Sequence, residues 1–236
     1  MRIIYSRTFV LIFVYISMNI IILGPQGSGK GTQAELIAKK YSLEHIDMGK
    51  TLRRIAKLDT PLGKEIYRIQ NVTKTLVPSK ILKEVLNVKL NSFPREQGIV
   101  FEGVPRTEDQ REYVEEILRE SGRKIDAAVY INLPEDESLE RIEKRRTCRK
   151  CGRPLIMGKD VKTGSDKCPD CGGEIFQRED DSPEGVKKRL QVFREETMPV
   201  IEHFRKKGML IEVDGTPSIA EVFESIILKL KEKFEN

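Results

Sequence analysis

A glycine-rich segment near the start of the chain has the composition of a phosphate-binding loop. It follows a short apolar run, Asn19 to Leu23, and precedes a stretch with helical periodicity. Glycines allow successive backbone N–H groups to turn toward one anion, while a helix N-terminus and Lys30 add positive charge. A plain strand-to-helix turn would not explain the lysine and its spacing. The predicted phosphate-binding residues are Gly27, Ser28, Gly29, Lys30, Gly31 and Thr32.

The four cysteines form two pairs, each with two residues between its members, and all lie between positions 148 and 171. Four thiolates at this spacing can surround one Zn²⁺ tetrahedrally, and iron is the other metal that such a set accepts. With every position filled by protein, the metal would be structural and would supply folding energy to a segment poor in aliphatic side chains. The predicted ligands are Cys148, Cys151, Cys168 and Cys171.

Several arginines could neutralise phosphate charge, because a guanidinium binds phosphate oxygens through two hydrogen bonds and stays charged. Arg141 and Arg145 are four residues apart in a segment expected to be helical, so they would share one helix face. By themselves, these residues and Arg146 fit a solvated helix face better, as charged runs usually do. Their assignment to a site depends on the order of motifs along the chain.

That order resembles the adenylate kinase family, in the form that has a long zinc-binding lid. The resemblance runs from Met18 to the C-terminus, and its motifs are jointly specific although the phosphate loop alone is not. The further motifs are Gly49 with Arg53, Leu76-Val77-Pro78, the EGVPRT sequence of residues 102–107 with Gln110, Arg141 with Arg145 and Arg146, the REDD sequence of residues 178–181, Arg189, and the DGT sequence of residues 214–216.

The resemblance implies a reversible, Mg²⁺-dependent phosphoryl transfer in which ATP and AMP give two ADP, a reaction of purine nucleotide homeostasis. The implied catalytic residues are Lys30, Arg106, Arg145, Arg178 and Arg189. ATP would be bound by the phosphate loop with Arg141, Arg145 and Pro217, and Glu102 would contact Mg²⁺ through water. AMP would be bound by Met48, Arg53, Thr75, Leu76, Val77, Gly103, Val104, Pro105, Arg106, Gln110, Arg178 and Arg189.

The chain departs from the family pattern at two positions that bear on function. Glu102 stands where the family usually has Asp, which affects the metal geometry. Met48 stands where a Thr or Ser is usual, and a thioether packs softly where a hydroxyl would bond a base edge. We therefore expect AMP to be the best acceptor without being exclusive. The alternative function is a broader nucleoside monophosphate kinase that also uses CMP, UMP or GMP, although Met48 could instead merely pack beneath the acceptor pocket.

Apolar runs alternate with amphipathic segments, which predicts an α/β fold with a doubly wound parallel sheet. The resemblance implies a phosphate-loop kinase core with five strands, over residues 18–46, 78–146 and 182–236, with a helical NMP-binding insertion at 47–77 and a zinc-binding lid at 147–181. We expect both insertions to close over the substrates. Strands are expected over residues 19–23, 99–101, 127–133 and 209–213. Helices are expected over residues 32–41, 52–55, 62–69, 81–90, 108–120, 135–146, 184–205, with a kink or break at Pro199, and 219–234.

Composition fits a folded protein, since 33% of the 236 residues are charged and 39% are hydrophobic. Because 42 Lys and Arg are interspersed with 37 Asp and Glu, the charge does not demand nucleic acid. Paired cysteine knuckles also occur in nucleic-acid-binding ribbons, so a distant alternative is an ATP-dependent nucleic-acid-binding zinc-ribbon protein. Residues 147–181 hold one aromatic side chain, Phe176, which favours the enzyme. We expect a cytoplasmic monomer with no nucleic acid partner; a small homo-oligomer is the alternative.

Residues 1–17 precede this pattern and contain an apolar run from Phe9 to Ile16. The run is too short to span a bilayer, and it lacks the small-residue cleavage site of a signal peptide. We interpret it as an extension produced by the choice of start codon, with translation beginning at Met18. If the extension is retained, its β-branched and aromatic residues would pair with a sheet edge or another subunit, and only then would a membrane partner be expected.

Overall fold

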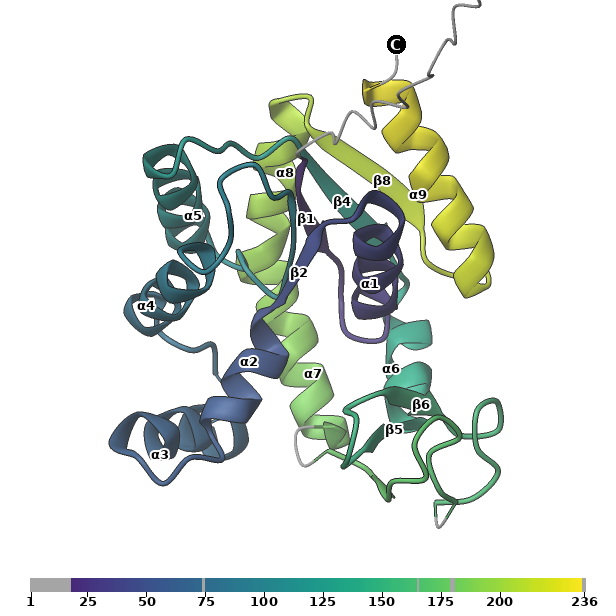
Figure 1. Cartoon of the computed structure of the whole chain (residues 1–236). Coiled ribbons are helices and arrows are strands. Elements are labelled where there is room, and N and C mark those ends of the chain that lie inside the picture. The colour runs from purple at the N-terminus through teal and green to yellow at the C-terminus, as the bar shows by residue number, and fades with distance from the viewer. Residues whose placement is uncertain (1–17, 74, 165, 179–180, 235–236) are drawn as a thin grey trace, which may run out of the picture.

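Five parallel strands form the central sheet of the protein, here a computed structural model (Figure 1). The structure describes residues 18–73, 75–164, 166–178 and 181–234, so the extension at 1–17 lies outside the described residues. The strand order is β2-β3-β1-β4-β8. The strands are β1 (Asn19–Leu23), β2 (Glu44–Asp47), β3 (Ile99–Glu102), β4 (Ala127–Asn132) and β8 (Leu210–Asp214).

The central strand β1 is buried at all its positions, as a parallel strand covered on both faces should be. Its side chains alternate between two apolar clusters. Ile20 and Ile22 belong to one cluster, and Ile21 and Leu23 belong to the other. The apolar run therefore predicted this strand correctly.

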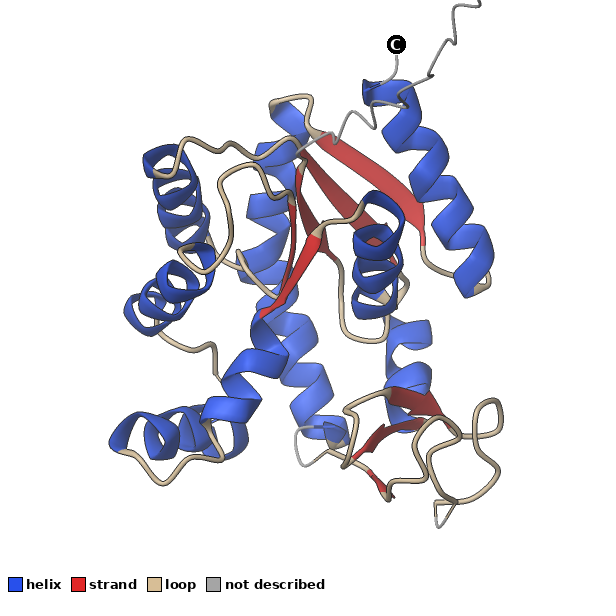
Figure 2. Ribbon diagram, in the orientation of Figure 1, coloured by secondary structure: helices blue, strands red, loops and turns tan. Residues whose placement is uncertain are grey.

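Helices cover both faces of the sheet, which confirms the doubly wound α/β fold (Figure 2). One face packs against α1 (Lys30–Tyr41) and α9 (Ile219–Phe234). The other face packs against α4 (Ser79–Leu90), α5 (Glu108–Glu120) and α8 (Met198–Lys206).

The edge strand β2 was not among the predicted ranges. Its sequence is Glu-His-Ile-Asp, and only Ile46 is buried. An edge strand needs fewer apolar side chains than a central one, so hydrophobicity gives little signal for it. Its pairing with β3 sets Asp47 beside Glu102 at the carboxyl end of the sheet.

Two groups of elements project beyond that end of the sheet (Figure 1). The first contains α2 (Met48–Ile55), α3 (Pro61–Tyr67) and the π-helical turn η1 (Arg68–Thr73). The second follows α6 (Glu135–Glu143) and is a three-stranded antiparallel sheet of order β6-β5-β7. Its strands are β5 (Arg145–Cys148), β6 (Pro154–Ile156) and β7 (Ile175–Phe176).

The prediction that Arg141 and Arg145 share a helix face is wrong. Helix α6 ends at Glu143, and Arg145 is the first residue of β5, where it pairs with Ile156. The chain has to become extended here because β5 must reach Cys148 and pair with β7. The strong helical pattern of the preceding residues therefore ends earlier than the sequence indicated.

The predicted long helix over 184–205 is divided, as Pro199 led us to expect. Helix α7 (Pro183–Val192) is followed by a π-helical turn, η3 (Phe193–Thr197), and then by α8. Pro199 lies in the first turn of α8, where its missing N–H leaves no bond unmade.

Within the described part of the chain, no helix is long and apolar enough to cross a membrane.

Candidate functional site

The glycine-rich loop connects β1 to α1 and places Lys30 at the first position of that helix. Gly27 and Gly29 have φ values of 80° and 81°, which side chains other than glycine rarely adopt. The ammonium of Lys30 donates a hydrogen bond to the carbonyl of Pro25, 3.0 Å away, so the side chain curls back over the loop. The loop therefore has the form of a phosphate-binding loop, with the ammonium of Lys30 close to its backbone.

Glu102 lies directly against this loop from the end of β3. A Cβ atom at position 31 would lie 3.1 Å from its Oε1, so the glycine at that position leaves room for the carboxylate. His45, on β2, places its Nε2 3.1 Å from Oε2 of the same carboxylate. The longer side chain at position 102 is thus accommodated by Gly31 and held by His45, a contact that sequence analysis missed.

Four charged side chains lie close enough to Lys30 to affect its pKa. Burial lowers the pKa of Lys30 to about 7; Glu102 offsets part of this effect, while Arg106, Arg145 and Arg189 add to it. Residues that are far apart in the sequence therefore meet at the carboxyl end of the sheet, where parallel α/β folds bind ligands.

Burial and nearby charges also shift the pKa values of Glu102 and Arg106, two of the neighbours of Lys30. Burial opposes ionisation of Glu102, but the hydrogen bond with His45 and the charges of Lys30 and Arg106 hold its pKa below the usual range. Burial, and then the charge of Arg189, lower the pKa of Arg106. The site is therefore a cationic space with an ionised carboxylate at one side.

Arg106 is fixed by the loop that leaves β3. Its Nε donates to the carbonyl of Gly103 at 3.0 Å, and its backbone N–H donates to Oε1 of Gln110 at 2.8 Å. Between these residues, Val104 and Pro105 are joined by a cis peptide bond.

The remaining predicted acceptor residues come from α2 and from the chain that follows η1. Arg53, on α2, is close enough to Arg106 to lower its pKa. Met48 is only 1% exposed and belongs to the core cluster together with Val77 and Val104. Thr75 is exposed and Leu76 half-buried. Whether Met48 touches a bound base stays a prediction.

A buried aspartate that sequence analysis gave no role joins two of the predicted catalytic arginines. Asp181 accepts from Nε of Arg145 at 2.9 Å and from a terminal nitrogen of Arg189 at 3.1 Å. These contacts hold the pKa of Asp181 below its usual range although burial alone would raise it. Its place in the REDD motif was visible, but nothing in the sequence indicated which arginines it would reach.

Two other predicted arginines are held elsewhere. Nε of Arg178 donates to the hydroxyl of Thr147 at 2.9 Å, which anchors it to β5. The guanidinium of Arg141 donates to the carbonyls of Gly215 and Thr216, at 2.9 and 3.0 Å. Arg141 therefore lies beside the loop that contains Pro217, and a shared role of the two in binding ATP stays a prediction.

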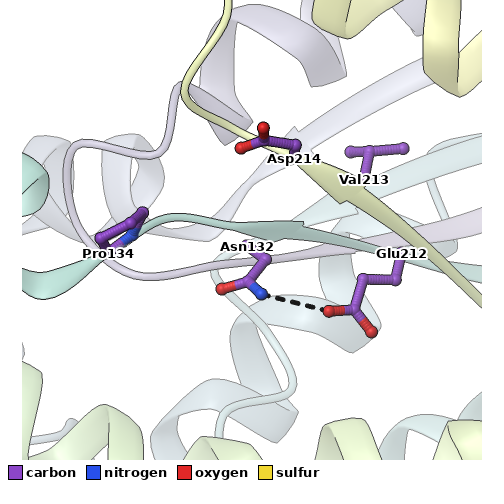
Figure 3. Close-up of a pocket in the computed structure, with 5 residues that line it drawn as sticks. All are labelled: Asn132, Pro134, Glu212, Val213 and Asp214. Atoms are coloured by element: carbon purple, nitrogen blue, oxygen red, sulfur yellow. Dashed lines mark hydrogen bonds between the residues drawn. The ribbon is translucent and has the colours of Figure 1, made fainter.

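A separate pocket of about 320 Å³ opens at the ends of β4 and β8 (Figure 3). It is lined by Asn132, Pro134, Glu212, Val213 and Asp214, and none of these is a predicted site residue. Its polar groups already have hydrogen-bond partners, since Asn132 donates to Glu212, and Asp214 accepts from Thr216 outside the pocket. The charged space around Lys30 is the stronger candidate for chemistry.

The four cysteines come together in the second projecting group, as predicted. Their Sγ atoms all lie within 4.8 Å of one another, and the pairs Cys148–Cys171 and Cys151–Cys168 are 3.4 and 3.8 Å apart. Ligand sulfurs about 2.3 Å from a tetrahedral Zn²⁺ would be about 3.8 Å apart. The donor set therefore fits a metal ion, and its spacing and thiolate chemistry suit zinc.

Gly173 is the position at which this cradle depends most clearly on the lack of a side chain. A Cβ atom there would lie 2.7 Å from Cβ of Lys150 and 2.8 Å from Sγ of Cys148. Contacts this short require the second knuckle to move, and with it Cys171. Gly164, in the same segment, has no atom within 4 Å of an added Cβ.

We therefore expect Gly173→Ala to weaken metal affinity by about tenfold or more, the size of effect seen when the surroundings of metal ligands are disturbed. Gly164→Ala should retain the affinity of the unmodified protein. Competition titration with a chromogenic chelator measures both variants. Equal affinities for the two would show that the cradle does not depend on the close approach at Gly173.

Comparison with known proteins assigns a family. The family model for adenylate kinase matches residues 22–209. An adenylate kinase of Archaeoglobus fulgidus is 40% identical over 217 residues, which are 91% of this chain and 100% of that protein. Those of Thermodesulfovibrio yellowstonii and Clostridium tetani are 38% and 40% identical, over 92% and 89% of this chain and 100% and 96% of their own lengths. Together with the phosphate loop and the arginines around Lys30, these matches show that the chain belongs to the adenylate kinase family.

Proposed function

We propose that this protein is an adenylate kinase that transfers a phosphoryl group reversibly between ATP and AMP to give two ADP. The observation that carries the proposal is the meeting of Lys30 with Arg106, Arg145, Arg189 and Glu102 at the carboxyl end of the sheet. Phosphoryl transfer requires little covalent work from a protein, but it requires two phosphate groups in line and their charge neutralised. A half-buried group of cations beside a phosphate loop supplies both.

On the donor side, the N–H groups of the loop and the ammonium of Lys30 would hold the phosphates of ATP. Arg141 and Pro217 would border its base, since Arg141 is bonded to the two carbonyls that precede Pro217. Mg²⁺ would enter with ATP, and Glu102, ionised and fixed by His45, would accept a hydrogen bond from one of its waters.

On the acceptor side, Arg53 and Arg106 would bind the phosphate of AMP, and Gln110 would read its base. Arg145 and Arg189 would pass from Asp181 to the transferring phosphoryl group, because a phosphate offers the same bidentate acceptor with more charge. Arg178 would join them as its segment moves inward.

We propose that residues 47–77 form the NMP-binding insertion and residues 147–181 the lid, around a core of residues 18–46, 78–146 and 182–236. One hydrogen bond and one close approach support closure of both insertions over the site. Lys188, on α7, donates to the carbonyl of Thr73 at 2.8 Å. Across the site, a Cβ at Gly152 would lie 3.7 Å from Cε of Lys50, so the lid approaches α2.

The metal in the lid would be Zn²⁺ with a structural role, and when bound it would supply folding energy to a segment with a small apolar cluster. Free thiols and a metal suit the cytoplasm, where we place the protein. We propose a monomer without a nucleic acid partner. The proposal that nucleic acid does not bind is supported by two contacts within the segment. Arg149 covers the ring of Phe176 at 4.5 Å, and Arg153 pairs with Asp170, so these groups are engaged with the protein itself.

The activity is tested with ATP and AMP in a coupled assay of ADP formation. Lys30→Ala should lower kcat by about 100-fold or more, because a buried charge on the transferring phosphates is lost. The matched control is Lys40→Ala, an exposed lysine in the last turn of the same helix, which should behave as the unmodified protein. Near-normal turnover by Lys30→Ala would contradict the proposed role of Lys30 in phosphoryl transfer.

Binding of ATP should take up protons near neutral pH. With a pKa of about 7, Lys30 is largely neutral at about pH 8 and must regain its proton when phosphates arrive, because their charge raises its pKa. At about pH 6 it is already charged, so uptake should vanish and affinity should be higher. Calorimetry of MgATP binding in two buffers of different ionisation enthalpy measures this uptake. Lys30→Met should abolish it and Lys40→Met should not; heats that are independent of the buffer at the higher pH would contradict the prediction.

The choice of acceptor is tested at Met48. Its burial supports the packing interpretation, so Met48→Thr should lower the melting temperature and leave the relative kcat/KM values for AMP, CMP, UMP and GMP unchanged. Met48→Leu, which keeps volume and apolarity, should restore most of the stability. A rise in the preference for AMP in the threonine variant would instead mean that residue 48 contacts the base.

A further inference from the structure

The peptide groups of Arg106 are held from both sides. Its N–H donates to Gln110 on α5 at 2.8 Å, and its carbonyl accepts a hydrogen bond from Oγ1 of Thr197 at 2.9 Å. The first bond is local, whereas the second spans 91 residues of sequence. Thr197 therefore joins the loop that carries Arg106 to the divided helix that carries Arg189.

The bond from Thr197 is unusual for a threonine in a helix. A helical threonine commonly donates to the carbonyl of its own preceding turn. Thr197 instead directs its hydroxyl out of the helix, although its side chain is buried, with 5% exposed. A part-buried carbonyl that lost this partner would have to find another, so loss of the hydrogen bond should cost free energy.

The π-helical turn explains how Thr197 can face Arg106. In a regular α-helix, residues 189 and 197 would be separated by about 80° around the axis, beyond two full turns. In the π-helical turn Phe193–Thr197 the hydrogen bonds join residues five apart instead of four, so the turn takes up about one extra residue and removes about 100° of rotation. Arg189 and Thr197 consequently lie on the same side of the helix, toward Arg106.

This alignment matters because Arg106 and Arg189 carry like charges. Each is close enough to the other for repulsion to oppose the approach of their guanidiniums before phosphate arrives. The hydrogen bond from Thr197 to the carbonyl of Arg106 holds the loop of Arg106 against the helix that carries Arg189. It therefore keeps the two arginines together without using either guanidinium.

We propose that Thr197 is a positioning residue for Arg106, and that the π-helical turn is the device that aims it. The inference rests on the proposed function, in which Arg106 binds the phosphate of AMP. Thr197 itself would touch no substrate. Its loss should let Arg106 drift from Arg189 and weaken the acceptor site selectively.

The test compares Thr197→Val, which keeps the shape and removes the hydroxyl, with Thr197→Ser, which keeps the hydroxyl. For the valine variant we expect kcat/KM for AMP to fall about tenfold, with KM for ATP within about twofold of the unmodified value. The serine variant should recover most of the loss. Ser121→Ala is the matched control, since it removes a hydroxyl-to-carbonyl bond of 2.9 Å to Leu118 at the far end of α5.

A second measurement isolates the route through Arg106. In an Arg106→Ala background, adding Thr197→Val should not weaken AMP binding further by calorimetry, because the group being positioned is already gone. Additive losses in this cycle would overturn the proposal. The proposal would also be overturned if Thr197→Val had a normal kcat/KM for AMP, or if its binding of ATP were weakened as much as its use of AMP. It would be overturned as well if Thr197→Ser lost as much activity with AMP as Thr197→Val. Absence of ADP formation by the unmodified protein would instead reject the proposed function itself.

Discussion

Crowding like charges into a half-buried space is the constraint on which the rest of the structure depends. Lys30, Arg106 and Arg189 repel one another, and burial adds a desolvation cost, as the lowered pKa values of Lys30 and Arg106 reflect. Glu102 offsets part of this cost at Lys30 and Arg106, and Asp181 does so at Arg145 and Arg189. The protein thus holds in place an arrangement that becomes fully favourable only when phosphates supply the missing negative charge.

Positioning these cations requires anchors outside the site. Arg106 is held through its backbone by Gln110 and Thr197, and Arg145 begins a strand that is tied to the cysteine cradle. Such preorganisation removes the need to order the side chains when substrate binds, which is the chief means by which a phosphotransferase accelerates its reaction. The loop that carries Arg106, strand β5 and the cysteine cluster therefore all contribute to placing the same group of charges.

The sequence predicted those parts of the fold in which local pattern and burial agree. The central strand at 19–23 and the helix at 108–120 have the expected bounds, because a continuous apolar run and a capped amphipathic period are strong signals. Strand β2 was missed since a polar edge strand has neither signal, and α6 was extended too far since nothing local marks the change to β5. The hydrogen-bond partners of individual side chains were hardest to predict. The phosphate loop and cysteines are contiguous motifs, whereas the contacts of Asp181 and His45 depend on how distant segments meet.

Strand β5 has a consequence for how the proposed lid, residues 147–181, can be altered. Arg145 and Cys148 lie three residues apart, so about 10 Å of extended backbone joins the proposed phosphate-binding arginine to the first cysteine of the cluster. Pairing with β6 and β7 on its two sides makes this strand a short rigid rod. The exposed turn near Gly164 lies outside the rod and between the two knuckles. A reporter domain grafted at that turn would move with the proposed lid and leave the spacing between Arg145 and the cysteine cluster unchanged.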